Sequence, residues 1–289
     1  MPNNPTNSHR LPKTSLKTVL PNNPFIDKTL PIGIIDSGVG GLSIAKCISE
    51  TLPHEHLIYI ADSMHAPYGD KSVNFIQDRI VSISQYLLKN PVKALVIACN
   101  TATVNAIEHL RALIDIPIIG VEPAIKPAAQ LSKNKKVGLL VTQATAENVH
   151  FQALIKQHHN GADIHIQPCL GLVETIESGN IDTVQCQQLL LRYLEPLQDK
   201  GIDTLVLGCT HYPFLQSMIK NILGEQVTII ETAAPVTLQL SKILVQAELN
   251  APLHQTARHQ FYSSNNSVQQ QQLFNQLWQQ KLSLHKLPL

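Results

Sequence analysis

The sequence predicts an α/β protein with two pseudo-symmetric domains, each built on a mostly parallel sheet flanked by helices. Three observations support this prediction. Short apolar runs alternate with amphipathic segments of helical length, the runs recur in the same order in the second half, and two matched runs end in a cysteine. Ligands bind at the carboxyl ends of strands in open parallel sheets. We therefore expect the active site in the cleft between the two domains.

Four apolar runs in the first half of the chain have counterparts in the second half. The offset between partners rises slowly along the chain, from 105 to 111 residues. Residues 32–36 match 137–141, 57–61 match 164–168, 93–99 match 203–209, and 116–120 match 227–231. The shared order predicts two domains of similar topology.

Segments with apolar residues at helical spacing lie between these runs. They cover residues 42–50, 73–89, 103–113, 149–157, 186–198 and 214–223. Strands that alternate with helices form parallel βαβ units, whose sheets are covered on both faces.

The last sixty residues continue the pattern after the repeat has closed. We expect a helix over 235–249, a strand over 259–263 and a helix over 268–282. This tail is predicted to pack back onto the first domain, which gives a first domain of 31–122 plus 232–289 and a second of 123–231. Residues 1–30, rich in Asn, Pro, Ser and Thr, are expected to form a flexible N-terminal extension.

Composition excludes several classes of protein. The chain has 289 residues, 44% hydrophobic content and a net charge of +1, typical of a globular domain without a nucleic-acid surface. It has no apolar run of roughly 18 residues for a membrane helix and no secretory signal. Five cysteines without tight spacing indicate a reducing compartment. We expect a cytoplasmic protein with no membrane and no direct nucleic-acid partner.

Cys99 and Cys209 end matched strands, and polar residues and a predicted helix follow each of them. Thiols at helix N-termini have lowered pKa values and can act as thiolates. A cysteine hydrolase needs only one nucleophile, and no C-x-x-C spacing supports zinc, so we expect no metal and no cofactor. Two thiols suit proton transfer at a stereocentre, where one removes the α-proton and the other protonates the opposite face. Three further cysteines have no matched partner and are expected to be structural: Cys47, Cys169 and Cys186.

A glycine-rich turn over residues 36–41 follows the first strand. Such a turn before a helix favours an anionic ligand, and a carboxylate is the ligand of suitable size. The alternative is a tight turn with Ser37 as a helix cap. Asp36 could accept a hydrogen bond from a substrate ammonium or tune Cys99, and His211 could do the same for Cys209.

Other polar residues near the predicted strand ends are candidate ligand contacts. Asn100 and Thr101 could hold a carboxylate, and the turn at Tyr68 and Gly69 could offer a hydroxyl and a backbone N–H. Glu174 is a second-half carboxylate that could support His211. Each of these residues also has a structural reading as a cap or turn residue.

Four motifs together resemble the glutamate racemase family. They cover residues 35–42, 66–69, 98–102 and 208–213, in the family's order, and the likeness extends over about 31–282. The resemblance implies a cofactor-independent isomerase that supplies D-glutamate for peptidoglycan, and therefore for the cell wall and cell shape.

The resemblance also implies roles for individual residues. Cys99 and Cys209 would be the two proton donors and acceptors, assisted by Asp36, His211 and Glu174. The substrate site would comprise Asp36, Ser37, Tyr68, Gly69, Asn100, Thr101, Thr210 and His211. The implied partners are glutamate, a second copy in a homodimer or monomer–dimer equilibrium, and a peptidoglycan-precursor activator of the kind found for some members with N-terminal extensions.

Two departures and two alternatives remain. Val141 stands where the family commonly has glycine before threonine, and Leu170–Gly171 replaces a common proline, which affects the geometry around Glu174. An aspartate racemase is the nearest alternative, although His211 favours the glutamate type over the acid typical of aspartate racemases. A restraining role on DNA gyrase, as reported for some glutamate racemases, has no identifiable surface in the sequence.

Overall fold

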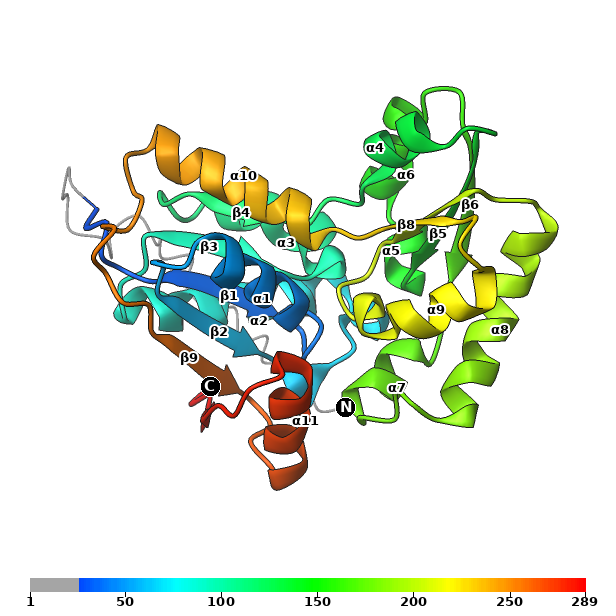
Figure 1. Cartoon of the computed structure of the whole chain (residues 1–289). Coiled ribbons are helices and arrows are strands. Elements are labelled where there is room, and N and C mark those ends of the chain that lie inside the picture. Colours follow the sequence, from blue (N-terminus) through cyan, green and yellow to red (C-terminus); the bar gives the residue numbers. More distant parts are fainter. Residues whose placement is uncertain (1–25) are drawn as a thin grey trace, which may run out of the picture.

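The computed structural model describes residues 26–289, which form two α/β lobes joined side by side (Figure 1). Each lobe contains a sheet in which every neighbouring pair of strands is parallel. This is the fold class that the sequence predicts. Most of the expected N-terminal extension, residues 1–25, lies outside the described residues.

The first sheet has the strand order β10-β9-β2-β1-β3-β4. Its strands are β1 (Ile32–Asp36), β2 (Leu57–Ala61), β3 (Ala94–Ile97), β4 (Ile118–Gly120), β9 (His259–Ser263) and β10 (Leu284–Lys286). Helices α1 (Leu42–Thr51), α10 (Ala233–Gln246) and α11 (Val268–Trp278) pack together on one face, and α2 (Val73–Lys89) and α3 (Asn100–Arg111) on the other.

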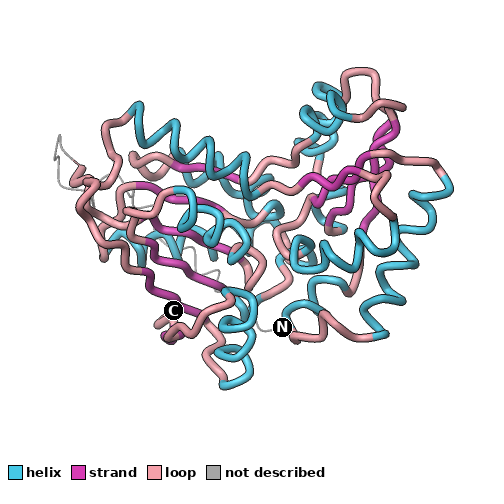
Figure 2. Tube along the Cα trace, viewed as in Figure 1, coloured by secondary structure: helices cyan, strands magenta, loops and turns pink. Residues whose placement is uncertain are grey.

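The second sheet has the strand order β6-β5-β7-β8. Its strands are β5 (Lys136–Val141), β6 (Asp163–Pro168), β7 (Thr204–Leu207) and β8 (Thr228–Ile230). The helices of this lobe are α4 (Ile125–Leu131), α5 (Gln143–Glu147), α6 (Val149–His158), α7 (Leu172–Glu177), α8 (Val184–Asp199) and α9 (Gln216–Leu223). The tube view shows the same alternation of strands and helices in both lobes (Figure 2).

The two sheets share one topology. Strands β2-β1-β3-β4 lie in the same order as β6-β5-β7-β8, and the sequence repeat pairs these strands one to one. The tail adds β9 to the free edge of β2, with Tyr59 beside Phe261 in the register. Burial on both faces explains why β1, β2, β3 and β7 are apolar runs, apart from Asp36 at the end of β1 and Thr204 at the start of β7.

Several elements differ from the sequence prediction at their boundaries. Helix α3 begins at Asn100 rather than at residue 103, because Cys99 is its N-cap. Helix α11 ends at Trp278, where Gln279 takes a left-handed conformation (φ 62°), and the chain then forms the unpredicted strand β10. The short helices α4, α5 and α7 were also not predicted, because five to seven residues are too few to give a clear helical period.

Within residues 26–289, no helix combines the length and the apolar character needed to cross a membrane.

Candidate active site

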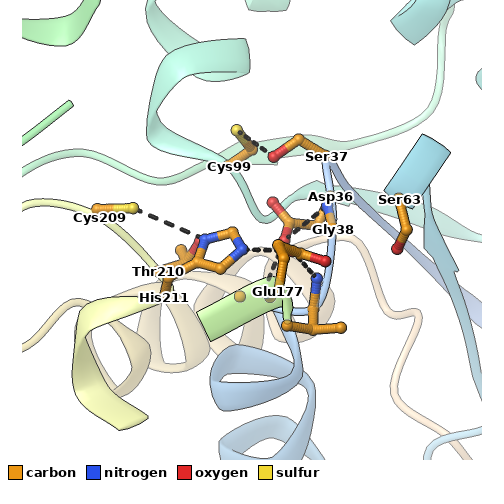
Figure 3. Close-up of polar contacts among 12 residues, drawn as sticks. Asp36, Ser37, Gly38, Ser63, Cys99, Glu177, Cys209, Thr210 and His211 are labelled. Atoms are coloured by element: carbon orange, nitrogen blue, oxygen red, sulfur yellow. Dashed lines mark hydrogen bonds and ion pairs between the residues drawn. The ribbon is translucent and has the colours of Figure 1, made fainter. Parts of the chain in front are cut away.

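Cys99 and Cys209 lie at equivalent positions just after β3 and β7. Cys99 caps α3, where its sulfur accepts a hydrogen bond from the Ala102 amide at 3.4 Å, and it donates to Ser37 Oγ at 3.6 Å. Cys209 Sγ lies 3.7 Å from His211 Nδ1 (Figure 3). Both cysteines are buried and line one cavity between the two lobes.

This cavity contains most of the side chains that the sequence predicts for the site. Its lining comprises Ser37, Pro67, Tyr68, Gly69, Cys99, Asn100, Thr101, Thr142, Val173, Cys209, Thr210 and His211. Its volume is about 10 Å³, close to what one water molecule requires. Pro67, Thr142 and Val173 are contacts that the sequence reasoning did not select. Of the predicted site residues, Asp36 and Glu174 are not part of the lining.

A larger cavity of about 480 Å³ lies among α3, α6 and the segment after β4. It contains none of the predicted site residues. We therefore identify the candidate active site by its paired thiols, and by polar groups without partners in the described part of the chain, rather than by its volume.

The carboxylate that contacts His211 is Glu177, not Glu174. Glu177 Oε1 lies 2.6 Å from His211 Nε2, whereas Glu174 is exposed one turn earlier on α7. The expected support of His211 by Glu174 is therefore wrong. Glu174 directly follows Leu172–Val173, and Glu177 lies three residues further along the same helix. The sequence could not decide which of the two carboxylates faces His211, because this depends on how α7 is placed.

His211 is buried between two acidic partners. Burial disfavours the imidazolium, but the hydrogen bonds and negative charges of Cys209 and Glu177 raise the pKa of His211 well above 6.5. The ring is then a cation at neutral pH, with Nδ1–H directed at the Cys209 sulfur and Nε2–H at Glu177.

Asp36 is fully buried at the end of β1. Its Oδ2 accepts hydrogen bonds from the amides of Gly41 at 2.8 Å and Gly38 at 3.3 Å. Its Oδ1 has no hydrogen-bond partner among the described residues. Burial raises its pKa to about 6, against the opposing effects of His211 and the Gly41 amide. Asp36 is therefore mostly ionised at neutral pH.

The expected lowered pKa of the thiol is wrong for Cys99. Burial and the charge of Asp36 raise its pKa, and the helix amide of Ala102 and Ser37 only partly oppose this. Cys99 is therefore a thiol in this structure. A thiol with a raised pKa is a proton donor at rest and a strong base once it is deprotonated.

Asn100 lines the cavity with unused hydrogen-bonding capacity. Its side chain is buried, and neither its Oδ1 nor its Nδ2 has a partner among the described residues. An unpaired buried amide costs free energy unless a ligand satisfies it. Asn100 is thus a candidate ligand contact, as the sequence predicts.

Tyr68 does not offer its hydroxyl to the cavity. Its Oη donates to Asp62 Oδ2 at 2.8 Å, and Arg79 holds the same carboxylate with two hydrogen bonds of 2.8 Å each. Only the ring and backbone of Tyr68, together with Gly69, are left to line the cleft.

Across residues 26–289, no three His, Cys, Asp or Glu side chains are grouped in a way that could hold a metal ion.

The chain is similar to proteins of known activity over nearly its whole length. Residues 32–238 match the family model described as Asp/Glu/Hydantoin racemase. The glutamate racemase of Pseudomonas entomophila is 42% identical over 266 residues, covering 91% of this chain and 99% of that protein.

Two solved structures have the same fold. Glutamate racemase RacE1 of Bacillus anthracis has a TM-score of 0.82 at 34% identity, covering 91% of this chain and 98% of that chain. The Escherichia coli glutamate racemase, solved with L-glutamate and the activator UDP-MurNAc-Ala, has a TM-score of 0.79 at 33% identity, covering 89% and 98%. The paired thiols, the two-lobed fold and these similarities lead to one conclusion: the chain is a racemase and belongs to the Asp/Glu/hydantoin racemase family.

Proposed function

We propose that this racemase interconverts L- and D-glutamate by proton transfer between two cysteines, without a cofactor. The observation that carries the proposal is that Cys99 and Cys209 line the same cavity from equivalent strand ends of the two lobes. A planar carbanion between them can be protonated from either side, so two opposed thiols invert the stereocentre. Glutamate as substrate is supported by relatives at 42% identity and by the L-glutamate bound to the E. coli enzyme.

The two thiols differ in their surroundings. Cys209 faces the His211 imidazolium, whereas Cys99 is a thiol beside Asp36. The resemblance to glutamate racemases pairs Cys209 with the L-isomer, so that Cys209 removes the α-proton of L-glutamate and the Cys99 thiol protonates the opposite face. The D-isomer reacts in the reverse direction, with Cys99 as the base.

Polar groups in the cleft are suited to a dicarboxylic amino acid. Asn100, Thr101 and Thr210 offer amide and hydroxyl donors to the carboxylates. Asp36 does not line the closed cavity, but its Oδ1 has no partner among residues 26–289, and we assign it to the substrate ammonium in the opened cleft. A cation at that point would offset the effect of Asp36 on Cys99 and ease deprotonation of this thiol.

The test is racemisation in deuterated water without pyridoxal phosphate. We expect D-glutamate to form from L-glutamate, with deuterium at the α-carbon, when the reaction is followed by chiral chromatography and proton NMR. Cys99→Ser and Cys209→Ser should each lower kcat by about 10²- to 10⁴-fold, the usual contribution of a general acid or base. The absence of α-exchange with glutamate would contradict the proposal, and turnover of L-aspartate alone would identify an aspartate racemase.

We further propose that the product D-glutamate supplies peptidoglycan synthesis in the cytoplasm. The E. coli relative is bound to UDP-MurNAc-Ala as an activator. A titration of this nucleotide into the same assay tests whether the chain shares that regulation. Light scattering in parallel tests the expected monomer–dimer equilibrium.

A further inference from the structure

The glycine-rich turn after β1 is held rigidly in place. Asp36 Oδ2 accepts from the amides of Gly38 and Gly41. From the opposite side, the buried Tyr59 donates its hydroxyl to the Gly38 carbonyl at 2.7 Å. The turn therefore presents the Val39 amide in a fixed direction, toward the second lobe.

A carboxylate does occupy this turn, but it belongs to the protein. The Val39 amide donates to Glu177 Oε1 at 2.7 Å, and the same oxygen lies 2.6 Å from His211 Nε2 (Figure 3). Val39 belongs to the first lobe, whereas Glu177 and His211 belong to the second. One carboxylate oxygen thus joins the two lobes and contacts the imidazole that faces Cys209.

The glycines of this turn provide space rather than unusual backbone angles. A Cβ at Gly38 would lie 1.8 Å from Glu177 Oε1, and a Cβ at Gly40 would lie 2.3 Å from His211 Nδ1. Neither glycine has a φ in the left-handed region. Side chains of the second lobe occupy the space that these two positions leave open.

A second contact brings the lobes together at the same place. Ser43 Oγ, at the start of α1, donates to the Thr210 carbonyl at 3.1 Å. The ionisable groups that face His211 are Cys209 and Glu177 from its own lobe and Asp36 from the first lobe. The first lobe therefore contributes a hydrogen bond to Glu177, from the Val39 amide, and the charge of Asp36 near the histidine.

We propose that the turn 37–41 is a docking socket for the second lobe, in which Gly38 admits Glu177 and the Val39 amide fixes it against His211. This inference rests on the proposed function. Closure of the cleft then completes the Cys209–His211–Glu177 arrangement, so the base on this side is fully positioned only when the lobes are together. Gly38 and the Val39 amide are positioning groups, since neither needs to touch the substrate.

The test is Gly38→Ala. Because the carboxylate of Glu177 ends a flexible side chain, it can move away from the new methyl group, and the fold can be retained. We expect kcat to fall by about ten- to a hundredfold, the size of a lost charge-assisted hydrogen bond. When the new methyl group moves the Glu177 carboxylate away from His211, the pKa of His211 falls. The alkaline limb of the pH profile of kcat should then move to lower pH. A purely structural defect would lower kcat without moving this limb.

A double-mutant cycle distinguishes an effect of Gly38→Ala that acts through the Glu177 contact from a general distortion of the turn. If Gly38 acts by admitting Glu177, then Gly38→Ala should cost little more in a Glu177→Ala background. Glu195→Gln, an exposed carboxylate on α8, is the matched control and should retain full activity. Effects that multiply in the double variant would overturn the proposal.

Amide exchange gives a readout that does not need a substrate. Gly38→Ala and Glu177→Ala should each accelerate hydrogen exchange of the peptide covering residues 36–42 in the ligand-free protein, and Glu195→Gln should not. Unchanged exchange in both variants would contradict docking. Accelerated exchange in a protein without glutamate turnover would overturn the proposed function but retain the docking role.

Discussion

At the residue scale, the cleft gathers several buried ionisable groups around two thiols. Asp36 and His211 are both buried, and their pKa values are raised, which gives a carboxylate and an imidazolium at neutral pH. Burying these groups costs free energy that hydrogen bonds only partly offset. Such an arrangement is expected where function rather than stability determines the residue.

Asp36→Asn should therefore stabilise the fold while it impairs racemisation. The pKa of Asp36 is about 6 in the folded protein against 3.8 for an unperturbed carboxyl. Its protonated form stabilises the folded state below pH 3.8, and this contribution is lost as pH rises through 6. At pH 7 the variant should be more stable by about 1 to 3 kcal/mol.

Thermal unfolding from pH 4 to pH 7 measures this effect. The stability difference between variant and wild type should grow across that range. Asp182→Asn, an exposed residue, is the control and should show no such trend. A constant difference for Asp36→Asn would mean that Asp36 does not titrate near pH 6.

At the element scale, helix α2 fixes the loop that forms one wall of the cleft. Arg79 on α2 makes two hydrogen bonds to the buried Asp62, which also accepts from Tyr68 Oη and lies 2.9 Å from His65 Nδ1. Arg79, His65 and Tyr68 lower the pKa of Asp62 although burial would raise it. The Tyr68–Gly69 backbone is thus anchored to a helix outside the cleft.

Arg79→Met should loosen this loop and weaken substrate binding. It leaves the Asp62 carboxylate buried without its cation, a loss that raises the pKa of Asp62. We expect KM for glutamate to rise by about tenfold, equivalent to about 1.4 kcal/mol, with a smaller change in kcat. Steady-state kinetics measure this split, with the exposed Arg192→Met as control. An unchanged KM would show that the loop keeps its position without Arg79.

At the scale of the whole molecule, the candidate active site and a buried ion pair that joins distant segments lie at opposite ends of the first sheet. The carboxyl ends of β1, β3 and β7 meet at the cleft. At the opposite end of the first sheet, the buried Lys93 contacts Glu55 at 2.5 Å and the Lys28 carbonyl at 2.6 Å. Glu55 also accepts from the Ala251 amide, so one ion pair joins four distant parts of the chain.

Lys93→Ala should destabilise the protein without changing its chemistry. Removing one partner of a buried ion pair costs about 3 to 5 kcal/mol, because the other charge stays buried and unpaired. For a chain of this size that corresponds to roughly 6 to 20 °C in Tm. Differential scanning calorimetry measures the shift, and KM and kcat measured well below Tm should be those of the wild type. A change in KM would mean that this ion pair also influences the cleft.

The closed cleft also limits how substrate enters. A cavity of about 10 Å³ has room for about one water molecule, and an amino acid is several times larger. Hydrogen bonds cross between the lobes on two sides of the cavity, at Thr101 with Thr142 and at Val39 with Glu177. We therefore expect substrate binding to open the cleft and to break these hydrogen bonds for a time.

Much of the fold could be predicted from local patterns. Apolar runs of strand length and their repetition give eight of the strands, and the runs are clearest at the sheet centres, where parallel strands are buried on both faces. Strand β10 was not predicted, because Leu284–Lys286 is too short and too polar to be distinguished from a loop. The end of α11 at Trp278 was not predicted, because the left-handed conformation of Gln279 has no signal in the sequence.

The sequence by itself determined the paired cysteines, the strands that carry them and the chemistry that two thiols allow, because all of these depend on residue type and short-range periodicity. Only the tertiary structure decided that Glu177 rather than Glu174 faces His211, that Asp36 and burial raise the pKa of Cys99, and that the glycine turn receives a side chain of the other lobe. Each of these depends on distances between segments far apart in the chain. Burial and charge act through space, so their effects could not be predicted before the two lobes were placed against each other.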